Sequence, residues 1–84
     1  MYTLEFKERV TKDFSKLPLK EKNKVWDKLQ LLKKEPRPHG FRKLIGRENE
    51  YRVRFGSYRV IYQIDETLKK IVIIHVGHRK DIYR

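Results

Sequence analysis

Arginine recurs three times in the stretch "YRVRFGSYRVIY", at Arg52, Arg54 and Arg59. A guanidinium group is planar, stays charged at every physiological pH and carries a fork of N–H donors that binds phosphate through paired hydrogen bonds. Arginines that converge on one side of a fold therefore favour a bound anion. For this to happen, the chain must place the three side chains on a common face.

The spacing of the apolar residues predicts such a face. Residues 51–55 and 58–64 alternate in the period of two that is typical of strands, and the Gly-Ser pair between them suits a type II′ turn. Arg54 then faces Arg59, and Arg52 lies about 7 Å from Arg54 along the same strand. Like charges opposed across a hairpin are destabilising, so this face favours an anion. A solvated face paired with acidic residues is the alternative. The opposite face is a predicted core surface, formed by Tyr51, Val53, Phe55, Tyr58, Val60 and Tyr62.

The end of the chain, "GHRKDIYR", is a second group of residues that could do chemistry. It contains histidine, arginine and tyrosine directly after a predicted strand, and these side chains beside a basic surface are candidates for acid–base work. Within that strand, His75 is instead predicted to be a structural histidine with satisfied hydrogen bonds.

The charge distribution indicates which half of the chain binds an anion. The 84 residues, expected to form one domain over 1–84, carry a net charge of +11 and no cysteine. This excess points to a polyanionic partner, and the absence of cysteine excludes disulfides and thiolate metal sites. Nine of the thirteen lysines lie in residues 1–34, whereas eight of the nine arginines follow residue 36. The recognition surface is therefore predicted in the C-terminal half.

The longest apolar run, residues 71–74, is too short to span a bilayer, and the charged N-terminus does not fit a signal peptide. We therefore expect a cytoplasmic protein with no membrane partner.

The elements that position these residues follow from the periodicity of the apolar residues and from chain breakers. Besides the hairpin, the pattern predicts a strand at 2–7, helices at 8–17 and 19–34, a proline-rich loop at 35–40, a short extended piece at 41–46 and a central strand at 70–76.

The predicted order is β-α-α-β-β-β with a short C-terminal tail, which is an α+β domain with an antiparallel sheet. An N-terminal helical hairpin would cover the tyrosine–valine face and leave the arginine face open. Trp26 falls on the apolar side of the second helix and is predicted to belong to the core.

The whole chain resembles the RelE/ParE superfamily of toxins from toxin–antitoxin systems, and in particular its RelE-like branch of mRNA endonucleases. The segments that carry the resemblance are "KLIG", "YRVRFGSYRVIYQI" and "IIHVGHRKDIYR". The resemblance implies a small curved sheet backed by two helices, which agrees with the order predicted above.

It also implies an activity. RelE-like toxins cut mRNA in the ribosomal A site without a metal or other cofactor, by attack of the 2′-hydroxyl on the adjacent phosphate to give a 2′,3′-cyclic phosphate. By resemblance, Tyr83 acts as general base and Arg79 stabilises the transition state, while His78 is a competing base or acid. Arg52 and Arg54 would hold the phosphate, and Arg59 would act as a further stabiliser or as proton donor. These predicted catalytic residues are Arg52, Arg54, Arg59, Arg79, Tyr83 and His78. Further cations predicted to contact RNA are Arg42, Lys43, Arg47, Lys80 and Arg84.

The partners implied by the resemblance are a cognate acidic antitoxin and the ribosome with its mRNA, including contacts to 16S rRNA. Operon DNA would be contacted only through the toxin–antitoxin complex. Two alternatives remain open at this point. One is a ParE-like inhibitor of DNA gyrase that has the same fold and does not cleave RNA. The other is an inactive or regulatory relative whose arginine face serves only to dock the antitoxin.

Overall fold

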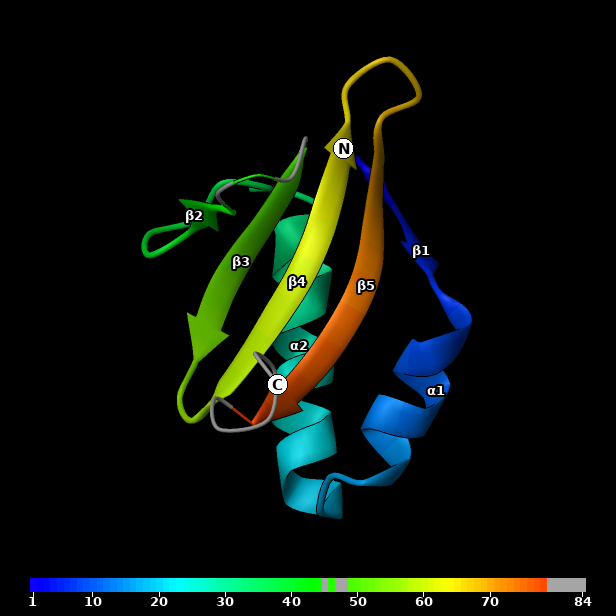
Figure 1. The fold of residues 1–84 in the computed structure, drawn as a ribbon, viewed down its shortest axis with the longest axis vertical. Coiled ribbons are helices and arrows are strands. Elements are labelled where there is room, and N and C mark those ends of the chain that lie inside the picture. Colours follow the sequence, from blue (N-terminus) through cyan, green and yellow to red (C-terminus); the bar gives the residue numbers. More distant parts are fainter. Residues whose placement is uncertain (45, 47–48, 79–84) are drawn as a thin grey trace.

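The chain folds into two helices and a five-stranded sheet (Figure 1). The computed structural model describes residues 1–44, 46 and 49–78. The elements are β1 (Thr3–Phe6), α1 (Glu8–Ser15), α2 (Leu19–Leu32), β2 (Arg42–Lys43), β3 (Glu50–Phe55), β4 (Tyr58–Asp65) and β5 (Lys70–His78). The predicted α+β order is confirmed, and the short extended piece at 41–46 contributes β2.

The sheet order is β1-β5-β4-β3-β2, so β5 is an interior strand, as its apolar sequence predicts. Neighbouring strands from β2 to β5 are antiparallel, but β1 pairs with β5 in parallel. The prediction of a purely antiparallel sheet is therefore wrong at this edge. Helix α2 runs back behind the sheet (Figure 1). The chain then reverses three times, from β2 to β3, from β3 to β4 and from β4 to β5, so β5 runs in the direction of β1.

The core lies between the helices and the predicted tyrosine–valine face. Leu29 of α2 and Tyr62 of β4 are fully buried in it, and the Tyr62 hydroxyl donates a 2.6 Å hydrogen bond to the carbonyl oxygen of Pro36. Burial raises the pKa of the Tyr62 phenol well above its usual value. The residues of this core are Val10, Leu17, Val25, Leu29, Leu32, Val53, Val60, Tyr62, Ile64, Ile71, Ile73 and Val76.

Trp26 is not a core residue. Its side chain is about half exposed and stacks on Phe6 of edge strand β1, with ring centroids 5.8 Å apart. The sheet ends at β1, so one side of the indole ring has no further strand to cover it. Within the described residues, no helix is long and apolar enough to cross a membrane.

A β-bulge changes the direction of the side chains along β5. Ile61 of β4 pairs with His75, whereas its neighbour Tyr62 pairs with Ile73, which leaves Ile74 as the extra residue. Ile73 points into the core before the bulge and Val76 does so after it. His75 therefore lies on the face away from the core.

Helix α1 covers the edge of β5 that β1 is too short to reach. β1 pairs with β5 only as far as Ile73. Beyond that point, a carboxylate oxygen of Asp13 in α1 accepts a 3.0 Å hydrogen bond from the backbone N–H of Val76. The end of β5, from which the C-terminal tail continues, is thus fixed by a side chain of α1.

Candidate nucleic-acid interface

The predicted hairpin forms with the predicted register. Arg54 pairs with Arg59, and Arg52 pairs with Ile61, so the three arginines share the face that the helices do not cover. Gly56 has φ of +63°, and the described non-glycine residues with positive φ lie elsewhere, at Asn49 and Lys69. This is the geometry of a type II′ turn. The two-residue turn brings the opposed arginines into register.

Neighbouring strands extend this face, which we call the arginine face. Arg42 of β2 pairs with Arg52, and Gly77 of β5 pairs with Arg59. Paired residues project to the same side of a sheet, so Arg42 joins the three hairpin arginines there. Gly77 has no side chain and adds no bulk beside Arg59. The arginine face therefore consists of Arg42, Arg52, Arg54 and Arg59, with Ile61, His75 and Gly77 between and beside them.

The side of the sheet away from the helices is divided by charge. Glu50 of β3 and Glu5 of β1 lie on the same side as the arginines but one row further along the strands, where each pairs with an uncharged residue of the neighbouring strand. Beside these carboxylates, Nζ of Lys70 lies 3.1 Å from a carboxylate oxygen of Glu5. The cations therefore gather at the turn end of the β3–β4 hairpin and the carboxylates at the other end. An extended polyanion would be attracted to the turn end.

Two predicted site residues are placed away from the arginine face. Lys43 pairs with Tyr51 and so belongs to the opposite side of the sheet. His78 pairs with Tyr58, and the two rings pack edge to face with their centroids 5.7 Å apart. His78 therefore also lies on the tyrosine side. The predicted site residues that fall outside the described residues are Arg47, Arg79, Lys80, Tyr83 and Arg84.

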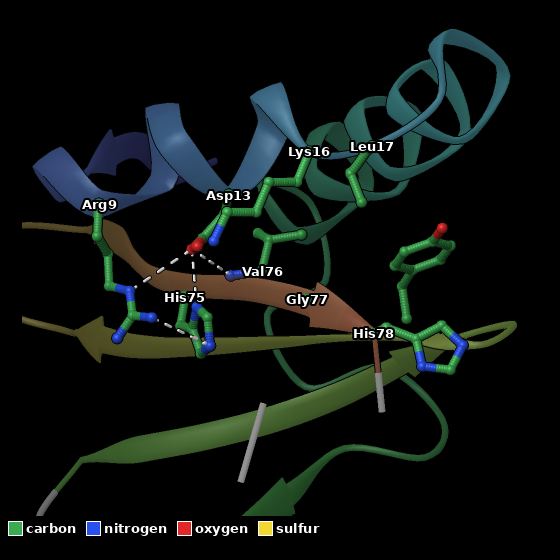
Figure 2. A pocket seen from close by; sticks show the side chains of 9 residues that line it. Arg9, Asp13, Lys16, Leu17, His75, Val76, Gly77 and His78 are labelled. Carbon is green, nitrogen blue, oxygen red and sulfur yellow. Dashed lines mark hydrogen bonds and ion pairs between the residues drawn. The ribbon is translucent and has the colours of Figure 1, made fainter. Parts of the chain in front are cut away.

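A polar cluster that the sequence does not reveal lies beside this face, between α1 and β5 (Figure 2). Oδ2 of Asp13 lies 2.7 Å from Nδ1 of His75, and Nε2 of the same ring lies 3.4 Å from Nη2 of Arg9. The cluster lines one side of a pocket of about 250 Å³ that also includes His78. The prediction that His75 is a hydrogen-bonded structural histidine is confirmed. Its partner Asp13 is 62 residues away in sequence, so no local pattern indicates the contact.

No group of three His, Asp or Glu side chains within the described ranges is arranged to hold a metal ion. Among the described residues, the cationic side chains are the prominent functional groups on the arginine face. Such a surface can bind and orient phosphate groups and can stabilise negative charge that develops on them.

Comparison with known proteins gives consistent matches over nearly the whole chain. The family model described as "ParE toxin of type II toxin-antitoxin system, parDE" matches residues 4–83. Toxin RelG of Mycobacterium tuberculosis is 36% identical, over 99% of this chain and 97% of the relative.

Solved structures show the same architecture. The toxin–antitoxin complex RelBE2 from Mycobacterium tuberculosis contains a chain with a TM-score of 0.81 and 32% identity, covering 93% of this chain and 98% of that one. The archaeal RelE–RelB complex from Pyrococcus horikoshii contains a chain with a TM-score of 0.82 and 29% identity, covering 95% of this chain and 97% of that one.

Proposed function

The chain belongs to the RelE/ParE family of toxins of type II toxin–antitoxin systems, and on this premise we propose that it is an endoribonuclease that cuts mRNA in the ribosomal A site. The observation that carries the proposal is the arginine face, on which Arg52, Arg54 and Arg59 lie together on the side of the sheet away from the helices. A toxin that only inhibits by docking does not require three neighbouring arginines on one face of the sheet. Cleavage of a phosphodiester requires positive charge there.

The proposed reaction uses the RNA's own 2′-hydroxyl as the nucleophile. Its oxygen forms a bond to the adjacent phosphorus, its proton passes to a general base, and the bond from phosphorus to the 5′-oxygen breaks as that oxygen takes up a proton. The products are a 2′,3′-cyclic phosphate and a 5′-hydroxyl. Negative charge increases on the phosphate oxygens in the transition state, and fixed guanidinium donors stabilise it.

The arginines divide this work according to their positions. Arg52 and Arg54 lie two residues apart on β3 and would hold the non-bridging oxygens from one side. Arg59, directly opposite Arg54 on β4, would stabilise the transition state from the other side. Arg79 would add a further positive charge.

Tyr83 is the proposed general base, as the family resemblance implies. A base must come within hydrogen-bond reach of the proton that it removes. The pairing of His78 with Tyr58 directs the histidine to the other side of the sheet, which favours the tyrosine over the histidine in this role.

The proposed partners follow from charge and from the relatives. The similar solved structures include complexes of RelE with RelB, and we propose that a cognate antitoxin of net negative charge neutralises this chain by covering the arginine face. The net charge of +11 makes such a partner electrostatically favourable. The toxin would act in the cytoplasm, where ribosomes translate, and would contact 16S rRNA as well as mRNA. It would contact operon DNA only through the antitoxin complex.

A single 2′-deoxy substitution tests this mechanism. Ribosomes are programmed with a message that carries deoxyribose on the 5′ side of a mapped cleavage site, and the purified protein is added. We expect no cleavage at that phosphodiester and full cleavage of the all-ribose message, because the nucleophile has been removed from only one of them. End-group analysis should find cyclic phosphate on the all-ribose product. Cleavage at the deoxy position would contradict 2′-hydroxyl attack.

A ParE-like gyrase inhibitor is the second candidate, because the family model that matches this chain is that of the ParE toxin. It would bind gyrase through the same fold and leave RNA intact. Expression of this chain would then cause DNA breaks while messages stayed full length, which is the reverse of the outcome proposed here.

A further inference from the structure

Arg9 is the one arginine that precedes residue 36, and the structure places it at the border of the arginine face. Its side chain extends from α1 past the edge of β5 and ends beside the His75 ring (Figure 2). His75 pairs with Ile61, and Ile61 pairs with Arg52, so Arg9 lies at one end of a row of residues that crosses the sheet. Two strand spacings, about 10 Å, separate His75 from Arg52 in this row.

A chain of hydrogen bonds orients the Arg9 guanidinium. A carboxylate can only accept, so the 2.7 Å contact with Asp13 places a hydrogen on Nδ1 of His75. In the neutral ring Nε2 then keeps its lone pair and accepts from Nη2 of Arg9 at 3.4 Å. Nε of Arg9 lies 3.7 Å from the Asp13 carboxylate. These contacts involve Nε and Nη2, and a guanidinium carries five N–H donors, so Nη1 can still bind an oxygen.

The exposed fractions of these side chains fit a ligand site at the Arg9 guanidinium, which is the solvent-facing end of the hydrogen-bonded chain. The Arg9 side chain is 60% exposed, whereas those of His75 and Asp13 are 15% and 6% exposed. The negative charge of Asp13 is turned away from solvent, and the backbone N–H of Val76 and the His75 ring both donate to it. An approaching anion would meet the guanidinium group first.

We propose that Arg9 binds a backbone phosphate of single-stranded nucleic acid next to the one held by Arg52, Arg54 and Arg59, with Asp13 and His75 as its positioning residues. The site extends the RNA-binding surface into the N-terminal half of the chain and rests on the proposed function. Without this role, the exposed Arg9 guanidinium makes only a 3.7 Å (i, i+4) ion pair with Asp13, and helix pairs of this spacing contribute little to stability.

Binding of an uncleavable probe tests the site separately from catalysis. A short single-stranded oligodeoxynucleotide has no 2′-hydroxyl, so its affinity can be measured over a range of salt concentrations whether or not the protein cuts RNA. We expect Arg9→Ala to weaken binding about tenfold at low ionic strength, since a charge-assisted hydrogen bond to phosphate is lost. The slope of log affinity against log salt should fall by about 0.7, the value for one phosphate contact in a single strand.

The matched control is Lys12→Ala, which removes an equal charge from an exposed position of the same helix. It should leave both affinity and salt slope close to wild type. Arg9→Lys should keep the salt slope and lose part of the affinity, because the charge remains and the fork does not. The proposal is overturned if Arg9→Ala binds like wild type, or if Lys12→Ala loses as much as Arg9→Ala.

His75→Asn tests the positioning role. An asparagine amide can replace Nδ1 as donor to Asp13 but is too short to reach Arg9. We expect affinity to fall severalfold in the wild-type background and to change no further in the Arg9→Ala background, because the two residues act through one contact. An equal loss in both backgrounds would show that His75 acts on the fold alone. Absence of RNA cleavage by the wild-type protein, with these binding results intact, would overturn the proposed function and leave the phosphate site standing.

Discussion

Arg59→Ala should lower the rate of message cleavage on ribosomes about a thousandfold, as expected when a guanidinium that stabilises developing phosphate charge is removed. Arg59 lies on the interior strand β4, directly opposite Arg54 and beside Gly77. Its Nε atom is buried, so its position is more restricted than that of exposed Arg54. The measurement is the single-turnover rate of cleavage of a bound message with the toxin in excess.

Two variants show whether the effect belongs to the site. Lys24→Ala removes the same charge from an exposed position of α2, on the other side of the sheet, and should cleave like wild type. Arg59→Lys should fall between wild type and Arg59→Ala, because lysine keeps the charge and loses the planar fork. Full activity of Arg59→Ala, or an equal loss in Lys24→Ala, would contradict the assignment.

Asp13→Ala should lower the free energy of unfolding by about 3 kcal/mol, since a buried charged acceptor of two hydrogen bonds is lost and two donors remain unsatisfied. Those donors are the backbone N–H of Val76 and the Nδ1–H of His75. They join α1 to the part of β5 that β1 does not cover. Equilibrium unfolding in urea measures the change.

The control for this prediction is Asp27→Ala, which removes a carboxylate from an exposed position of α2 and should change stability little. Asp13→Asn keeps an oxygen that can accept the same hydrogen bonds. Its loss of unfolding free energy should therefore lie between the losses of Asp27→Ala and Asp13→Ala. If Asp13→Ala is no less stable than Asp27→Ala, the contacts of Asp13 with β5 are not the ones that hold α1 in place.

The hairpin could be predicted in detail because its information is local. A period-two pattern on both sides of a two-residue turn leaves one register, and each predicted pair, from Tyr51 with Tyr62 to Phe55 with Tyr58, is present. The direction of β1 could not be predicted in this way. β1 pairs with β5, more than sixty residues later, and nothing in either strand's pattern distinguishes a parallel from an antiparallel neighbour.

The candidate site was predicted where side chains alternate regularly and missed where they do not. Regular alternation placed Arg52 and Arg54 together, and it also separates Lys43 from Arg42, although the two are adjacent in sequence. Counting by twos from Ile71 and Ile73 would direct His75 into the core, and the bulge at Ile74 reverses this. The contact of His75 with Asp13 depends on that bulge and on the packing of α1, neither of which has a sequence signal.

The most direct test of ribosome-dependent cleavage compares two messages that differ only at the start codon, which is functional in one and removed in the other. Each is incubated in a translation reaction with the purified protein, and cleavage is mapped by primer extension. We expect cuts within codons of the translated message and none in the untranslated one. An intact translated message, or identical cuts in both, would contradict it.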